Sequence, residues 1–209
     1  MNVHTVRQTI AGQAGDIECA LDAPAGETLG VAVICHPHPV HGGTMDNKVV
    51  ITLARAFLAI GFRTVRFNFR GVGGSQGAWD EGVGEIDDAM AVIAAHRRPG
   101  ERFMLGGFSF GAYVASMAQE RLTPDARPER MVLVGPSTQK QRMANVPADT
   151  IVVHGEADEV VPLAATFDWA RPQSLPIIVM PGVGHFFHGQ ITLLKNILVG
   201  QLQVPRSTN

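Results

Sequence analysis

Short apolar runs recur along the chain, and stretches with helical periodicity separate them. Two alternating segments, 5–10 and 16–21, are typical of a β-hairpin whose turn is AGQAG. Six later runs are almost continuously apolar, as is typical of strands covered on both faces of a parallel sheet. These runs cover residues 30–35, 63–69, 102–108, 130–135, 150–155 and 176–182.

Helices are predicted between these strands. Apolar residues from Val49 to Leu58 recur at helical spacing, Asp46 or Asn47 fits the N-cap, and Gly61 fits the position after the C-terminus. The other predicted helices cover about residues 82–97, 110–121, 162–170 and 189–202.

The alternation of strands and helices predicts an α/β fold. We expect a doubly wound, mostly parallel, eight-stranded sheet with helices on both faces, forming one domain over residues 1–209. The active groups of such a sheet lie beyond the carboxyl ends of its strands.

Composition narrows the class of function. The chain has 209 residues, 45% of them hydrophobic, a formal net charge of −2 and no long run of Lys or Arg, so we expect no nucleic-acid partner. No stretch approaches the roughly 20 apolar residues that span a bilayer, and the start MNVHTVRQTI lacks the apolar core of a signal peptide. Cys19 and Cys35 form no disulfide framework. We therefore expect a cytoplasmic protein without a membrane partner.

The stretch GGFSFGA, residues 106–112, places Gly107, Ser109 and Gly111 between a predicted strand and a predicted helix. In the G-x-S-x-G pattern a serine occupies a tight strand-to-helix turn, and small residues on either side let the chain double back. The turn exposes the hydroxyl beside backbone N–H groups and the helix N-terminus. Ser109 is therefore the candidate nucleophile; the alternative is a glycine-rich turn with an incidental serine.

A serine nucleophile needs a general base and an acid that orients this base. In the chain order serine, acid, histidine, the loop after residues 150–155 offers Asp158, with Glu156 and Glu159 as alternatives. Asp158 is favoured because it lies beside the apolar VVP stretch, whereas glutamate side chains are longer and more easily solvated.

Two histidines follow this acid. His185 lies on a glycine-rich loop directly after the last predicted strand, and His188 lies next to the final helix. We prefer His185 as the base and keep His188 as the alternative, or as a pocket residue. The predicted triad is Ser109, Asp158 and His185.

Five motifs resemble those of the α/β-hydrolase superfamily, and within it the small lidless bacterial serine hydrolases related to dienelactone hydrolases. They are CHPHPVHGGTMDNKVV, FNFRGVGGSQG, GFSFG, HGEADEVVP and PGVGHFFHG, and the resemblance covers about residues 16–200. It implies the α/β-hydrolase fold, and the short stretch from Pro136 to Asp149 leaves no room for a lid domain. Dienelactone hydrolases use a cysteine nucleophile, so Ser109 points instead to ester or thioester hydrolysis.

The stretch ICHPHPVHGG, residues 34–43, follows a predicted strand, and the resemblance implies that this loop supplies the second oxyanion donor. Proline has no N–H, so the two prolines leave only the N–H groups of His36 and His38 near the strand end. We expect the His38 N–H to act together with the N–H of Phe110.

A metal site is the alternative use of this stretch. His36, His38 and His41 lie close in sequence, but only Cys35 accompanies them as a further ligand type. A serine triad also leaves a metal ion without a role, so we expect neither a metal nor an organic cofactor.

The glycine-rich stretch FNFRGVGGSQG misses the G-x-G-x-x-G phosphate-binding pattern because Gln76 stands where the third glycine should be. The resemblance makes this loop a rim of the active site, with Arg70 and Asn68 holding neighbouring loops.

Several ring side chains are candidates for the substrate pocket. The preferred candidates are Phe108, Phe186 and His188, and further apolar rim candidates are Phe110, Phe187 and Trp79. For each aromatic residue the alternative is ordinary core packing.

These features predict a carboxylesterase-type serine hydrolase that cleaves small-molecule esters through an acyl-enzyme. The first alternative is a thioesterase or acyltransferase with the same triad, and the second is a binding module without activity. The sequence leaves a monomer and a homodimer both open.

Overall fold

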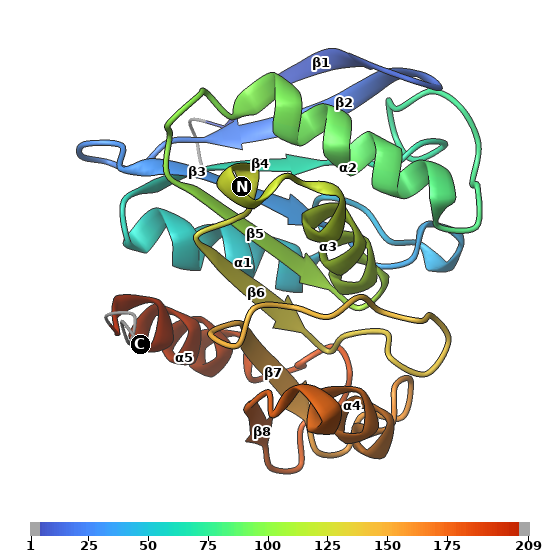
Figure 1. Ribbon diagram of the computed structural model, residues 1–209, viewed down its shortest axis with the longest axis vertical. Coiled ribbons are helices and arrows are strands. Elements are labelled where there is room, and N and C mark those ends of the chain that lie inside the picture. Colours follow the sequence, from blue (N-terminus) through green and yellow to red (C-terminus); the bar gives the residue numbers. More distant parts are fainter. Residues whose placement is uncertain (1–4, 205–209) are drawn as a thin grey trace.

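One eight-stranded sheet runs through the computed structural model, which describes residues 5–204 (Figure 1). The strands are β1 (Val6–Gly12), β2 (Gly15–Asp22), β3 (Gly30–Cys35), β4 (Phe62–Phe67), β5 (Phe103–Phe108), β6 (Arg130–Val134), β7 (Ile151–Gly155) and β8 (Ile177–Met180). Their order is β1-β2-β4-β3-β5-β6-β7-β8; β2 is antiparallel to both of its neighbours, and the other pairs are parallel. The predicted strands are confirmed, although β4 and β8 each end two residues early.

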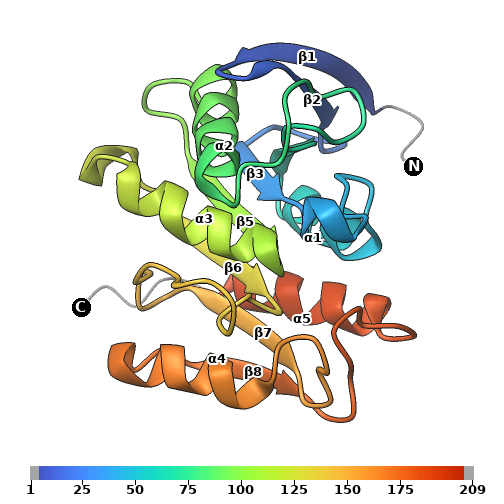
Figure 2. The same ribbon diagram turned by 90° about the vertical axis from the view of Figure 1, so that its right-hand side faces the viewer.

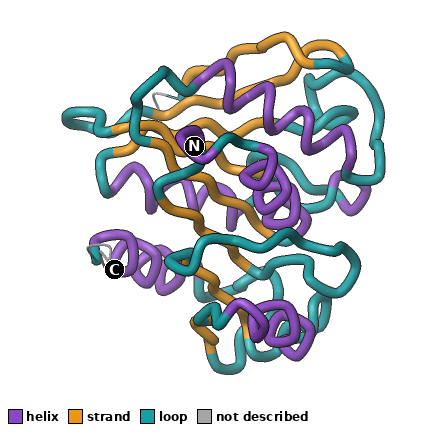
Figure 3. The backbone as a smooth tube through the Cα atoms, in the orientation of Figure 1, coloured by secondary structure: helices purple, strands orange, loops and turns teal. Residues whose placement is uncertain are grey.

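Five α-helices cover the two faces of the sheet. They are α1 (Lys48–Ala59), α2 (Val83–His96), α3 (Phe110–Arg121), α4 (Leu163–Ala170) and α5 (Ile191–Gln203). Figure 2 shows α2, α3 and α4 on one face and α1 and α5 on the other, and Figure 3 shows the strands as the layer between them. The predicted α/β fold is therefore confirmed.

The strand residues alternate between two buried clusters. In β3, Val33 and Cys35 pack on the side of α2 and α3, whereas Ala32 and Ile34 pack on the side of α1 and α5. All of these side chains are fully buried, which explains why the strand reads as a continuous apolar run.

The start of α1 settles which residue caps it. The side chain of Asn47, not that of Asp46, accepts a hydrogen bond from the Val49 N–H at 2.9 Å. Gly61 follows the helix with a φ of 87°, a conformation that favours glycine.

The loops beyond the carboxyl ends of the parallel strands lie at one end of the sheet. Between β6 and β7 the chain forms no helix or strand, so no lid is inserted there. Within residues 5–204, no helix has the length and apolar character needed to cross a membrane.

The glycine-rich loop at residues 68–78 packs against the β1–β2 hairpin, which corrects the expectation that it forms a rim of the active site. The Gln76 N–H donates to the Asp16 carbonyl at 2.8 Å, and the Glu18 N–H donates to Ser75 Oγ at 2.9 Å. None of the loop residues lines the cavity that contains Ser109.

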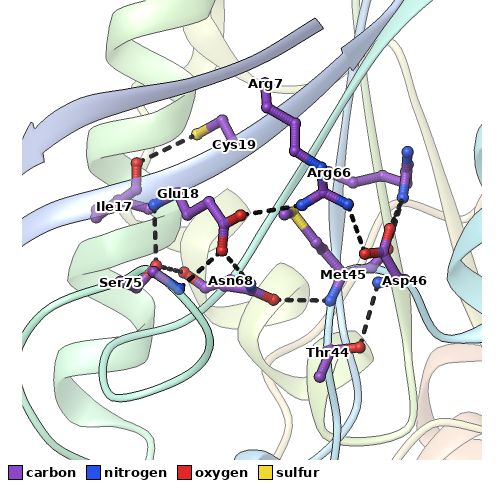
Figure 4. Close-up of polar contacts among 11 residues, drawn as sticks. Arg7, Ile17, Glu18, Cys19, Thr44, Met45, Asp46, Arg66, Asn68 and Ser75 are labelled. Carbon is purple, nitrogen blue, oxygen red and sulfur yellow. Dashed lines mark hydrogen bonds and ion pairs between the residues drawn. The ribbon is translucent and has the colours of Figure 1, made fainter. Parts of the chain in front are cut away.

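Asn68 and Arg70 hold neighbouring segments, as predicted. Asn68 accepts from the Met45 N–H at 2.9 Å and donates to Glu18 at 2.8 Å, which joins the hairpin to the base of the β3–α1 loop (Figure 4). The Arg70 guanidinium pairs with the buried carboxylate of Asp88 on α2 at 2.8 Å. The β3–α1 loop is therefore anchored at the end next to α1.

Candidate active site

Ser109 occupies the tight turn between β5 and α3. Its backbone angles are φ 57° and ψ −120°, a strained conformation for a residue with a side chain. A Cβ on Gly107 would lie 2.2 Å from the Gly111 carbonyl oxygen, and a Cβ on Gly111 would lie 2.2 Å from the Cys35 carbonyl oxygen. The glycines of G-x-S-x-G are thus required because α3 begins in contact with both β3 and β5.

The structure brings Ser109, His185 and Asp158 into one line of hydrogen bonds. Ser109 Oγ lies 3.0 Å from His185 Nε2, and His185 Nδ1 lies 2.7 Å from Asp158 Oδ2. Because a carboxylate only accepts, the proton lies on Nδ1, and Nε2 is free to accept the serine proton. All three side chains are buried or nearly so. This is the geometry that a histidine needs to act as a general base.

Asp158 is held as an anion. Its Oδ1 accepts hydrogen bonds from the N–H groups of Val160 at 2.9 Å and Val161 at 2.8 Å. Burial alone would raise its pKa, but the hydrogen bonds from His185 and from the Val161 N–H outweigh burial and hold the pKa below its ordinary value. An ionised Asp158 can fix the His185 tautomer and stabilise the imidazolium.

The alternative acids and base take other positions. Glu156 accepts from the Gly182 N–H at 2.8 Å, and Glu159 is exposed. His188 is exposed, and its ring lies against Phe186 with the centroids 5.8 Å apart. None of these three side chains is hydrogen bonded to a member of the predicted triad.

His154, near the end of β7, is a contact of Asp158 that the sequence analysis missed. Its ring is fully buried, and Nε2 lies 2.9 Å from the Val161 carbonyl oxygen and 3.4 Å from Asp158 Oδ2. Nδ1 lies 3.3 Å from Thr166 Oγ1 on α4. The available signal was a histidine in an apolar strand, four residues before the acid.

The candidate oxyanion donors lie beside the serine. The His38 carbonyl accepts from the His41 and Gly43 N–H groups at 3.1 and 3.0 Å, which folds the loop into the short helix η1 (Pro39–His41). Within residues 5–204, the N–H of His38 and that of Phe110 donate to no other group. Both residues line the same cavity as Ser109, and the Phe110 N–H belongs to the first turn of α3, where donors lack partners within the helix.

The imidazole of His36 is structural. Its Nδ1 lies 2.6 Å from the Pro37 carbonyl oxygen, and its Nε2 accepts from the Phe69 N–H at 3.0 Å. Burial lowers its pKa to about 3, against the opposing effect of the Pro37 hydrogen bond. Both ring nitrogens are therefore occupied by protein partners.

The imidazole of His38 packs against other rings. It lies against the rings of His41, Trp79 and Phe110, with centroid distances of 4.6, 4.5 and 5.1 Å. Its buried Nδ1 has no hydrogen-bond partner in the described part of the chain.

A cavity of about 310 Å³ opens in front of Ser109. Its walls come from the β3–α1 loop, the start of α3, the β6–β7 loop and the loops that carry Asp158 and His185. Of the predicted pocket residues, Phe186 lines this cavity and is 47% exposed, and Phe110 lines it as well. His188 lines an adjacent groove together with Phe186.

Two of the predicted rim residues belong to the core, which corrects that part of the sequence analysis. Phe108 is fully buried, and its ring supports that of His185 with the centroids 5.0 Å apart. Phe187 is fully buried among residues of α1 and α5. Neither ring lines the cavity that contains Ser109.

Comparison with known proteins points to one family. A family model described as "Serine aminopeptidase, S33" matches residues 38–152, which include Ser109. An uncharacterized protein of Rickettsia prowazekii is 30% identical over 194 residues, covering 84% of this chain and 79% of the relative.

Solved structures agree with this match. An α/β serine hydrolase homologue from Coxiella burnetii is 38% identical, with a TM-score of 0.83 and coverage of 94% of this chain and 97% of that one. An α/β serine hydrolase without a lid from Xanthomonas campestris is 34% identical, with a TM-score of 0.88 and coverage of 99% and 98%. The chain therefore belongs to the lidless α/β serine hydrolases.

Proposed function

We propose that this chain is a carboxylesterase-type serine hydrolase that cleaves small esters through an acyl-enzyme on Ser109. The observation that carries the proposal is the line of hydrogen bonds from Asp158 through His185 to Ser109, which ends in an open cavity. Membership of the α/β serine hydrolases supports hydrolase activity in general.

Acylation begins when Ser109 Oγ attacks the ester carbonyl carbon and His185 Nε2 takes the hydroxyl proton. The carbonyl oxygen gains negative charge and accepts hydrogen bonds from the N–H groups of His38 and Phe110. Asp158 stabilises the imidazolium. His185 then returns the proton to the leaving oxygen, the alcohol departs, and the acyl group remains on Ser109.

Deacylation repeats these steps with water. His185 takes a proton from a water molecule as its oxygen attacks the acyl carbon, and the same two N–H groups stabilise the second tetrahedral intermediate. Its collapse releases the carboxylic acid and restores the hydroxyl of Ser109.

The size of the cavity favours small esters. Its volume of about 310 Å³ lies at the lower end of the range of about 300–1,000 Å³ for small-molecule sites. Phe186 and the valines beside Asp158 offer a limited apolar surface, and no lid extends it.

The charges of the cavity favour an ester over a peptide N-terminus. The matching family model is described as a serine aminopeptidase, and an aminopeptidase substrate presents a cationic amino group next to the scissile bond. A buried cationic group needs an anionic partner. No Asp or Glu lines the cavity among the described residues, so we expect much weaker cleavage of amino-acid anilides than of esters.

The test is turnover of para-nitrophenyl acetate. Ser109→Ala should lower kcat by on the order of 10⁶, the size of effect seen when a serine nucleophile is removed. Ser137→Ala is the matched control, because Ser137 lines the same cavity but has no histidine base. Equal turnover by wild type and Ser109→Ala would refute the proposal, as would loss of activity in the Ser137 variant alone.

A further inference from the structure

The walls of the active-site cavity carry positive charge without any balancing acid. Lys140 is the permanently charged residue of the lining, and neither Asp nor Glu occurs in the lining among residues 5–204. The chain as a whole has a formal net charge of −2, so the charge of the cavity lining is opposite in sign to the net charge of the chain.

Lys140 lies on the β6–β7 loop, which is attached to the nucleophile turn. The Ser137 N–H of this loop donates to the Ser109 carbonyl oxygen at 3.3 Å. Lys140 also contributes, after burial and His41, to lowering the pKa of His38. Lys140 therefore lines the same cavity as Ser109, and its charge acts on the loop that carries the His38 N–H.

The Lys140 ammonium has no carboxylate partner within the described residues, where an arginine or a histidine supplies the cation of each ion pair. The acids of the loop that carries Asp158 do not line this cavity. The Asp158 side chain is fully buried behind His185, and Glu159 lines the adjacent groove.

A further donor in the cavity wall is an amide. The side-chain oxygen of Asn47 caps α1, so its NH₂ group is left for the cavity, where Asn47 is part of the lining. A negatively charged group in this cavity would meet donors and a cation, and no carboxylate. A cationic group would be repelled by Lys140 and would find no carboxylate among the described lining residues.

We propose that the preferred substrates are esters that carry a second, anionic group, such as a carboxylate, and that Lys140 selects them through this group. The proposal rests on the proposed esterase function. The anionic group can belong to the acyl part or to the alcohol part of the ester, and the test has one arm for each.

Each arm compares two esters of similar size. For the acyl part, the pair is the para-nitrophenyl monoester of adipic acid and para-nitrophenyl hexanoate. For the alcohol part, the pair is meta-acetoxybenzoate and its methyl ester. The measured quantity is kcat/KM of the anionic ester divided by kcat/KM of the neutral ester, so that changes in general activity cancel.

Three variants are compared with wild type. We expect this ratio to fall by about threefold in Lys140→Met and by roughly tenfold in Lys140→Glu, the range of an exposed ion pair and of its reversal. Lys195→Met on α5 is the control, because it removes the same charge outside the cavity and should leave the ratio unchanged. High salt should reduce the wild-type ratio towards that of Lys140→Met.

A fall in one arm supports the proposal and identifies the part of the ester that carries the charge. A ratio that is the same in wild type, Lys140→Met and Lys140→Glu in both arms overturns it, while turnover of the neutral esters leaves the esterase function standing. Absence of turnover of all four esters by the wild type would instead count against the esterase function itself.

Discussion

The role of the His38 N–H can be isolated by comparing two substitutions of the same residue. His38→Pro removes the N–H, because proline has none, whereas His38→Ala keeps it. His38 has a φ of −53°, which lies within the range of about −65 ± 15° that proline adopts. Since this N–H donates to no group within residues 5–204, the proline variant breaks no hydrogen bond that holds the fold.

The two variants share the loss of the imidazole ring. That ring packs on Trp79 and Phe110, and such aromatic contacts contribute about 0.5–1.5 kcal/mol each to stability. This loss is equal in both variants and cancels in their comparison. The two variants therefore differ by one of the two oxyanion donors. Loss of one donor corresponds to a decrease of about 10²–10³ in kcat, or about 2.7–4 kcal/mol of transition-state stabilisation.

The assay is kcat for para-nitrophenyl acetate, with the thermal midpoint of unfolding measured on the same samples. We expect His38→Ala to keep much of the wild-type activity. The kcat of His38→Pro should be about 10²–10³-fold lower than that of His38→Ala, which is the loss expected for one oxyanion donor. Equal activity of the two variants would refute the assignment of this N–H. Loss of activity in both folded variants would show that the imidazole itself takes part.

Three further predictions concern the support of the site. Gly111→Ala should destabilise the fold by about 1–3 kcal/mol and lower activity, because its Cβ would meet the Cys35 carbonyl oxygen. Gly200→Ala, in open space on α5, should instead stabilise the fold by about 0.5–1 kcal/mol. Equal unfolding midpoints of the two variants would contradict this prediction. The depressed pKa of Asp158 contributes stability that is complete above its unfolded pKa of about 3.9 and is lost as the pH falls through the lower folded value, so Asp158→Asn should flatten the acid limb of stability against pH. His154→Leu removes an N–H next to the charged Asp158 and should lower kcat about ten- to hundredfold. Thr166→Val, which removes the hydroxyl at the other ring nitrogen, should have a smaller effect. An unchanged kcat in His154→Leu would exclude a positioning role for His154.

The strands could be predicted from the sequence, and so could the three residues that the structure joins in one line of hydrogen bonds, because each prediction depends on neighbouring residues. Ser109, Asp158 and His185 lie in the loops after β5, β7 and β8, and parallel strands bring these loops to one end of the sheet. The choice of Asp158 over the two glutamates could also be made from the sequence, because Asp158 adjoins an apolar segment. The N–H groups of Val160 and Val161 in that segment donate hydrogen bonds to its carboxylate.

The predictions that failed depend on contacts that sequence periodicity does not contain. A strand covered on both faces is apolar throughout, so its pattern could not show that Phe108 lies under His185 and not in the cavity. The loop at 68–78 is positioned by hydrogen bonds to Asp16 and Glu18, which are more than fifty residues away in the chain. His154 is found only when the fold brings its ring to Asp158.

The most direct test of the esterase account is the site of covalent labelling by a fluorophosphonate probe. An activated serine attacks the phosphorus and displaces fluoride, and the resulting adduct can be located by mass spectrometry of peptides. The account predicts a single adduct on Ser109 in the wild type, no adduct in Ser109→Ala, and normal labelling of Ser137→Ala. A wild-type protein that stays unlabelled, or a Ser109→Ala variant that is labelled equally well, would contradict it.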